Sequence, residues 1–148
     1  MRRLVASSFG LGLIPRRLWG SDDGAGTFGA AVGAAIGWAL LAAPWWLDLI
    51  AAVVAIVLSA WAAAPFAEGD PGWVCVDETA GTLIAVIGLG GWPWLLAVLV
   101  ARAADIVKVL PGVRRAEELP GAVGVTADDA AAGLYGLAVG WAATGAGL

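Results

Sequence analysis

The sequence contains no histidine and only one cysteine, and each of these facts excludes whole classes of chemistry. Without histidine the chain cannot form a Ser-His-Asp triad, a phosphohistidine intermediate or a zinc site built on imidazole. Cys75 has no partner for an internal disulfide, and no arginine follows it at the spacing of a cysteine-phosphatase loop. Any catalysis must therefore use carboxylates, hydroxyls, Lys, Arg or a bound cation.

Ionisable side chains are also missing from four long stretches, which are residues 27–47, 49–67, 79–101 and 130–148. A helix needs roughly 20 apolar residues to cross the core of a bilayer, and a chain that is 61% hydrophobic and 14% charged has the composition of a membrane protein. We therefore predict an all-α fold, a small polytopic membrane helix bundle in one domain over residues 1–148. The net charge of −4 and the lack of a long basic run argue against nucleic acid as a partner. The sequence leaves the oligomeric state open.

The apolar stretches predict helices at about 28–43, 47–65, 78–88, 93–109 and 128–147. Residues 1–26 are rich in Gly, Ser and charge, which predicts loop or interfacial backbone. The third stretch allows two interpretations. It could form one spanning helix over 79–101, but Gly-Leu-Gly-Gly-Trp-Pro at 88–93 favours a turn, and hence a hairpin of two shorter helices.

The positions of the cations favour the hairpin. With it, all eight basic residues lie on one side of the membrane, whereas a single span would place the last four opposite the first four. The positive-inside rule makes the basic side cytoplasmic. We expect a multi-pass protein of the inner (cytoplasmic) membrane, with its polar clusters facing the cytoplasm and only Asp48 on the other side.

Two acidic pairs, Asp77 with Glu78 and Asp128 with Asp129, each stand at the start of a predicted apolar helix. Such carboxylates can simply cap the free backbone N–H groups of a helix and complement its dipole. The hairpin, however, brings both pairs and Asp105 to one surface, where five carboxylates would repel each other without a cation. Oxygen ligands of this kind suit Mg²⁺, so all five are candidate metal ligands.

Arg102, Asp105 and Lys108 are spaced i, i+3, i+6, which places them on one broad helix face. They could form a snorkelling membrane edge with an internal ion pair. They could also clamp a phosphate, with Asp105 either holding the metal or orienting Arg102. Gly26 and Thr27 open the first predicted helix on the same side. Their backbone N–H groups and the Thr27 hydroxyl could bind an anion, although Thr is also an ordinary helix N-cap.

In order and spacing, these motifs resemble the phosphatidylglycerophosphatase A family. The matching segments are Gly26-Thr27-x-Gly29, Val74-Cys75-Val76-Asp77-Glu78-Thr79-Ala80-Gly81, Arg102-x-x-Asp105-x-x-Lys108-x-x-Pro111 and Gly124-x-x-x-Asp128-Asp129-x-x-Ala132-Gly133. The resemblance implies a magnesium-dependent integral membrane enzyme. It implies removal of the terminal phosphate from phosphatidylglycerophosphate, which gives phosphatidylglycerol.

We therefore expect hydrolysis of a phospholipid monoester at the cytoplasmic membrane face. The expected catalytic carboxylates are Asp77, Glu78, Asp105 and Asp129. The expected phosphate-binding residues are Arg102, Lys108, Thr27 and Gly26. Attack by water and attack by an aspartate, with an aspartyl-phosphate intermediate, are both open. Two other functions fit parts of the pattern: a small cation-coupled transporter with broken helices, and a membrane assembly factor without catalysis.

Overall fold

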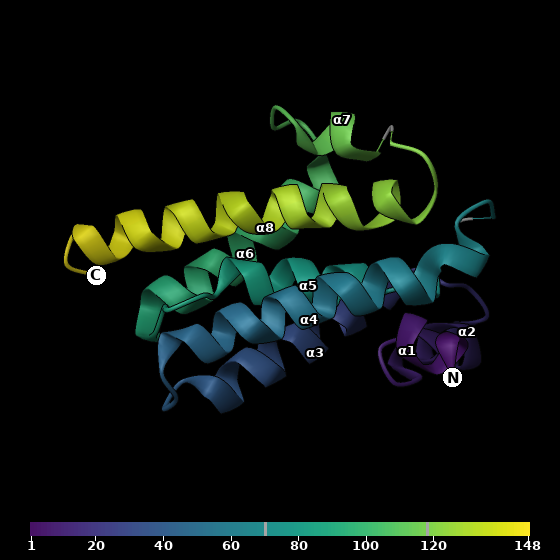
Figure 1. Ribbon diagram of the computed structural model, residues 1–148, viewed down its shortest axis with the longest axis horizontal. Coiled ribbons are helices and arrows are strands. Elements are labelled where there is room, and N and C mark those ends of the chain that lie inside the picture. Colours follow the sequence, from purple (N-terminus) through teal and green to yellow (C-terminus); the bar gives the residue numbers. More distant parts are fainter. Residues whose placement is uncertain (70, 118) are drawn as a thin grey trace.

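The computed structural model describes residues 1–69, 71–117 and 119–148, and over these residues it consists of helices joined by turns and loops, without strands (Figure 1). This confirms the predicted all-α class. The elements are α1 (Arg2–Ala6), the 3-10 turn η1 (Leu11–Leu13), α2 (Ile14–Trp19), α3 (Ala25–Leu40), α4 (Trp45–Ala63), the 3-10 turn η2 (Ala64–Phe66), α5 (Val76–Ala85), α6 (Gly91–Val107), α7 (Val113–Glu117) and α8 (Gly121–Gly145). The five long predicted helices correspond to α3, α4, α5, α6 and α8. Each begins before its predicted start, and α8 does so by seven residues.

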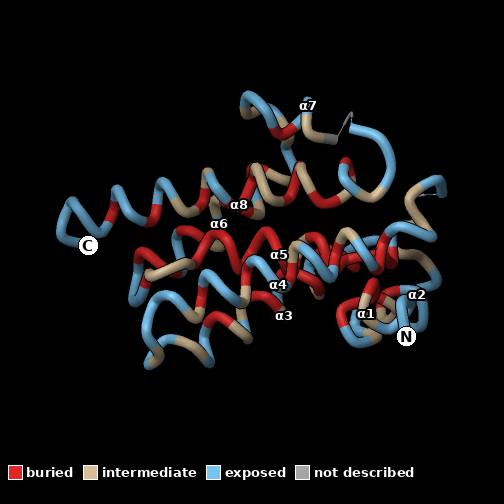
Figure 2. Tube along the Cα trace, viewed as in Figure 1, coloured by how far each residue is buried: buried red, intermediate tan, exposed pale blue. Residues whose placement is uncertain are grey.

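Helix α5 lies at the centre of the bundle, with α3 and α4 packed against it on one side and α8 on another. It is buried over most of its length (Figure 2). Small residues make this packing possible. A Cβ atom at Gly29 of α3 would overlap the carbonyl oxygen of Cys75, and one at Gly33 would lie 2.6 Å from the carbonyl oxygen of Thr79. Glycines at four-residue spacing thus let the backbones approach closely, as in helix pairs that associate in lipid.

The chain reverses direction between α5 and α6, so the straight helix over 79–101 is ruled out and the predicted hairpin is observed. Gly88 lies in this turn with φ of +67°, a conformation that favours glycine. Its N–H donates to Asp48 Oδ2 at 3.0 Å, and Trp141 Nε1 donates to the Ile87 carbonyl oxygen at 3.2 Å. Asp48, the one isolated charge in the sequence, therefore caps the hairpin turn.

The loop alternative for residues 1–26 is wrong, because α1, η1, α2 and the start of α3 lie there, while the interfacial alternative stays a prediction. This segment folds against the start of α5. The Ala6 carbonyl accepts the Cys75 N–H at 2.8 Å, and Ser8 Oγ bonds both the Cys75 carbonyl at 3.0 Å and Thr79 Oγ1 at 2.7 Å. Helices of five or six residues are unstable alone, so these tertiary contacts stabilise them.

Among the described residues, one helical stretch is long and apolar enough to cross a membrane: Trp45–Phe66, with a mean hydropathy of 2.3. Ala25–Leu40 is apolar but shorter. Only 28% of the spanning window is buried, and Val53 and Val57 are 51% and 62% exposed. A water-soluble protein rarely leaves such a helix uncovered. The apolar face of α4 is therefore suited to lipid, while the complete multi-pass arrangement stays a prediction.

Candidate active site

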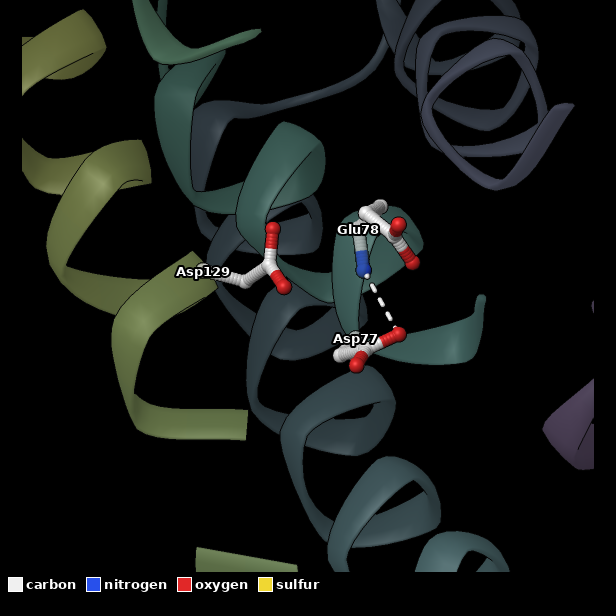
Figure 3. A group of neighbouring side chains, drawn as sticks. All are labelled: Asp77, Glu78 and Asp129. Atoms are coloured by element: carbon white, nitrogen blue, oxygen red, sulfur yellow. Dashed lines mark hydrogen bonds between the residues drawn. The ribbon is translucent and has the colours of Figure 1, made fainter. Parts of the chain in front are cut away.

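The structure gathers the five predicted carboxylates at the end of the bundle away from the hairpin turn. All five, together with Lys108, line one cavity of about 320 Å³. Ligand oxygens from Asp77, Glu78 and Asp129 lie within 4.8 Å of one another, and so do oxygens from Asp105, Asp128 and Asp129. Figure 3 shows Asp129 on α8 beside Asp77 and Glu78 on α5. Asp129 belongs to both triads and is the centre of the cluster.

The two acidic pairs reach the cavity from different places in their helices. Asp77 and Glu78 lie in the first turn of α5, as predicted, and Asp77 Oδ1 accepts the Glu78 N–H at 3.2 Å. Asp128 and Asp129 do not begin a helix. Because α8 starts at Gly121, they lie in its third turn, are buried, and cannot be N-terminal caps. The capping interpretation is wrong for this pair.

The extra turns of α8 form despite five residues of low helix propensity in Gly-Ala-Val-Gly-Val-Thr at 121–126. Thr126 Oγ1 and Ser59 Oγ of α4 share a buried hydrogen bond of 2.8 Å, which fixes this part of α8 against the bundle. Packing of this kind outweighs local propensity. The same packing brings Asp128 and Asp129 to the cavity that Asp77 and Glu78 of α5 also line.

Arg102 and Lys108 are each paired with an acid of the cluster. Arg102 Nη1 forms an ion pair with Asp105 Oδ2 and lies 3.8 Å from Glu78 Oε1. Asp105 was predicted either to orient Arg102 or to hold a metal. The ion pair supports the first role. Asp105 also belongs to a carboxylate triad, so the metal role stays a prediction. Lys108 Nζ lies 2.9 Å from Asp128 Oδ2.

The backbone at Lys108 differs from the prediction of a helix over 93–109. Helix α6 ends at Val107, and Lys108 is its C-cap in the left-handed region, with φ of 51°. Non-glycine residues rarely adopt this conformation. Lys108 therefore does not share a helix face with Arg102 and Asp105, although its ammonium reaches the same cavity.

Of the two residues predicted at the start of α3, only Gly26 meets the acid cluster. It is buried, and a Cβ there would overlap Glu78 Oε1 and lie 2.6 Å from Arg102 Nη2. Thr27 is exposed and is not among the residues lining the cavity. It is also not the N-cap, which is Gly24. The structure therefore brings Gly26 to the site by close approach and leaves Thr27 outside it.

Two glycines in the motif segments, Gly81 and Gly133, set the distance between the acids, a role that was not predicted from the sequence. A Cβ at Gly81 of α5 would lie 2.6 Å from the Asp129 carbonyl oxygen. A Cβ at Gly133 of α8 would overlap the Gly81 carbonyl oxygen. The backbones of α5 and α8 thus touch beside Asp77 and Asp129. Their position three or four residues after each acidic pair was the available signal.

The electrostatics of the cluster fit a bound cation. Burial raises the pKa of Asp77 and of Asp129 well above the ordinary value, and repulsion from Glu78 raises the pKa of both further. Glu78 Oε2 and Asp128 Oδ1 are buried without a hydrogen-bond partner in the described part of the chain. Buried carboxylate oxygens normally have partners. Hard oxygen ligands, excess negative charge and unsatisfied oxygens together suit Mg²⁺.

The fold and site define a class: a helical protein in which clustered carboxylates lie beside an Arg and a Lys, residue types that are suited to binding phosphoryl groups. The chain belongs to the phosphatidylglycerophosphatase A family, whose model matches residues 4–144. The family is named for phosphatidylglycerophosphatase activity. This confirms the resemblance found in the sequence.

One curated relative comes from Bacteroides thetaiotaomicron and bears the name "Putative phosphatidylinositol-3-phosphatase". It is 45% identical to this chain over 71 residues, which are 45% of this chain and 44% of that protein. The match thus spans less than half the length of the relative. No solved structure matches the chain.

Proposed function

We propose that this protein hydrolyses the terminal phosphomonoester of phosphatidylglycerophosphate, with Mg²⁺, at the cytoplasmic face of the inner membrane. The products are phosphatidylglycerol and inorganic phosphate. The observation that carries the proposal is the convergence of acids from α5, α6 and α8 with Lys108 on one cavity, next to Arg102. The family supplies the lipid class.

All five acids are candidate metal ligands, and two of them, Asp105 and Asp128, also position the cations Arg102 and Lys108. Asp77, Glu78 and Asp129 are the first candidate ligand set, and Asp105, Asp128 and Asp129 the second. When bound there, Mg²⁺ would polarise the phosphoryl group and lower the pKa of water. A carboxylate not engaged as a ligand accepts the proton of the attacking water.

The two cations act on the oxygens of the transferring phosphoryl group. Arg102 lines a small second pocket that shares Glu78, Asp105 and Asp129 with the main cavity. Its guanidinium, oriented by Asp105, offers two parallel N–H donors to developing negative charge. Lys108, held by Asp128 at the cavity wall, supplies a compact positive charge.

The arrangement of aromatic side chains supports the membrane orientation. Trp45, Trp92 and Trp141, all near the hairpin end of the bundle, are 61%, 76% and 51% exposed. Exposed tryptophans of this kind typically lie at a bilayer interface. The acids and most of the Lys and Arg residues lie at the opposite end. Clustering at one end, away from the helix centres, also favours surface hydrolysis over the transport hypothesis.

Purified protein in neutral detergent should release phosphate from phosphatidylglycerophosphate only while a divalent cation is present. Chelation should abolish release and added Mg²⁺ should restore it, because the acid cluster needs a cation to hold the phosphoryl group. Inorganic phosphate is measured directly. Phosphatidylinositol 3-phosphate is tested in parallel, because the relative bears that name. Release that persists through chelation contradicts the metal role, and cation flux in vesicles without lipid hydrolysis would favour transport.

A further inference from the structure

A separate concavity, of about 790 Å³, lies beside the acidic cavity. It is lined by residues 107–112 and by Arg114 and Arg115 of α7, and none of these residues is acidic. Lys108 lines both cavities. The two spaces therefore adjoin at one ammonium group, with carboxylates on one side and guanidinium groups on the other.

The segment that carries these arginines is packed in place. Val113 is fully buried beside Ala104 of α6 and Ala132 of α8. Tyr135 of α8 donates its hydroxyl hydrogen to the Pro111 carbonyl oxygen at 2.7 Å. The α6–α7 connection is thus fixed to α8 by an apolar contact and a hydrogen bond, and α7 packs against α8 (Figure 1).

Arg114 and Arg115 have charge to offer a ligand. Both are exposed, and neither guanidinium has an ion pair or hydrogen bond to any side chain that the structure describes, that is, those of residues 1–69, 71–116 and 119–148. Arg102 differs, since it is paired with Asp105. Planar guanidinium groups bind phosphate oxygens through two parallel hydrogen bonds. The described lining of the concavity therefore has the chemistry of a phosphate site, with cations and no carboxylates among its residues.

We propose that Arg114 and Arg115 bind the phosphodiester group of the same lipid molecule whose terminal phosphate enters the acidic cavity. This inference rests on the proposed function. Phosphatidylglycerophosphate carries a monoester and a diester joined by one glycerol unit, and the two adjoining cavities offer one site for each. A phosphodiester has a single negative charge, so carboxylates repel it and arginines attract it. Phosphatidylinositol 3-phosphate also carries both groups, whereas phosphatidate has no second phosphate.

The test compares Arg114→Gln/Arg115→Gln with Arg16→Gln/Arg17→Gln, a pair of exposed arginines on α2 that lies outside both cavities. In neutral detergent micelles, the α7 variant should raise the KM for phosphatidylglycerophosphate about tenfold with little change in kcat, because the diester takes no part in the reaction. The inhibition constant of phosphatidylglycerol, which has only the diester, should rise equally. Inhibition by inorganic phosphate should not change.

Binding of phosphatidylglycerol to the protein in neutral micelles, followed by tryptophan fluorescence, gives a readout without turnover. It decides the subsite even if the wild-type protein releases no phosphate, a result that would defeat the proposed function alone. Equal phosphatidylglycerol affinity in the α7 variant and the α2 control overturns the inference. The inference is also overturned if the α7 variant binds more weakly only to vesicles of anionic lipid, because that result would assign both arginines to the membrane surface. Weaker inhibition by inorganic phosphate would place them at the terminal phosphate and overturn it as well.

Discussion

Replacing Asp129 with Asn should slow phosphate release by roughly 10²- to 10⁴-fold and leave the protein folded. Asp129 supplies an oxygen to both carboxylate triads and lines both pockets at the site. The amide has the same shape but no charge, so it binds a divalent cation and polarises water far less well. No other single substitution weakens both candidate ligand sets.

The thermal stability of Asp129→Asn should not fall with its activity. Asp129 is buried among like charges, and their repulsion is lost in Asp129→Asn, so thermal unfolding without added metal should occur at an equal or higher temperature. Glu68→Gln is the matched control, because Glu68 is exposed and does not line the cavity. Phosphate release and melting temperature are measured on both variants. An Asp129→Asn protein with more than a tenth of wild-type activity would remove this residue from the chemistry.

Gly133→Ala should separate α5 from α8 and thereby disrupt the site from a distance. The added methyl group would overlap the Gly81 carbonyl oxygen and lie 3.1 Å from Ile84 Cβ. Backbone atoms cannot rotate away, so one helix must shift. Overpacking of this kind costs about 1–3 kcal/mol of folding free energy. Activity should fall with it, because Asp129 lies one turn before Gly133 on the same face of α8.

Gly145→Ala, at the end of the same helix, is the control for Gly133→Ala. No atom lies within 4 Å of the Cβ position there, and Ala favours a helix over Gly by up to about 1 kcal/mol. This control should be equally or slightly more stable and fully active. Chemical unfolding in detergent and phosphate release are measured on both variants. Equal stability of the two would mean that α5 and α8 do not touch as described.

The sequence predicts the long helices and the hairpin because those features depend on local chemistry. Charge-free stretches mark the helices, and Gly-Gly beside Pro at 88–93 marks the turn. Features that depend on distant contacts were missed. Residues 1–26 are helical in part because Ser8 bonds the start of α5, and α8 begins early in part because Thr126 bonds Ser59. No window of local sequence contains either partner.

The candidate site divides in the same way. The acids and the bases could be identified from residue type and spacing, since few other polar groups occur near the apolar stretches. Which acid pairs with which base could not be predicted. Lys108 reaches Asp128 only because α6 ends before it and its backbone adopts a left-handed conformation. Thr27 matched the motif but lies exposed outside the cavity, while its neighbour Gly26 touches Glu78 and Arg102. A motif gives the residues of a site, and the fold decides which of them face it.

Cysteine labelling from the two faces of the membrane tests the hairpin, on which the shared site depends. Glu68 precedes α5, Val109 follows α6, and Gly90 lies in the turn between them with open space around its Cβ position. Burial raises the pKa of Cys75 to about 11, so the native thiol should give little background with an impermeant maleimide. The account predicts that Glu68→Cys and Val109→Cys are labelled from the same face and Gly90→Cys from the other. Labelling of Glu68→Cys and Val109→Cys from opposite faces would contradict it.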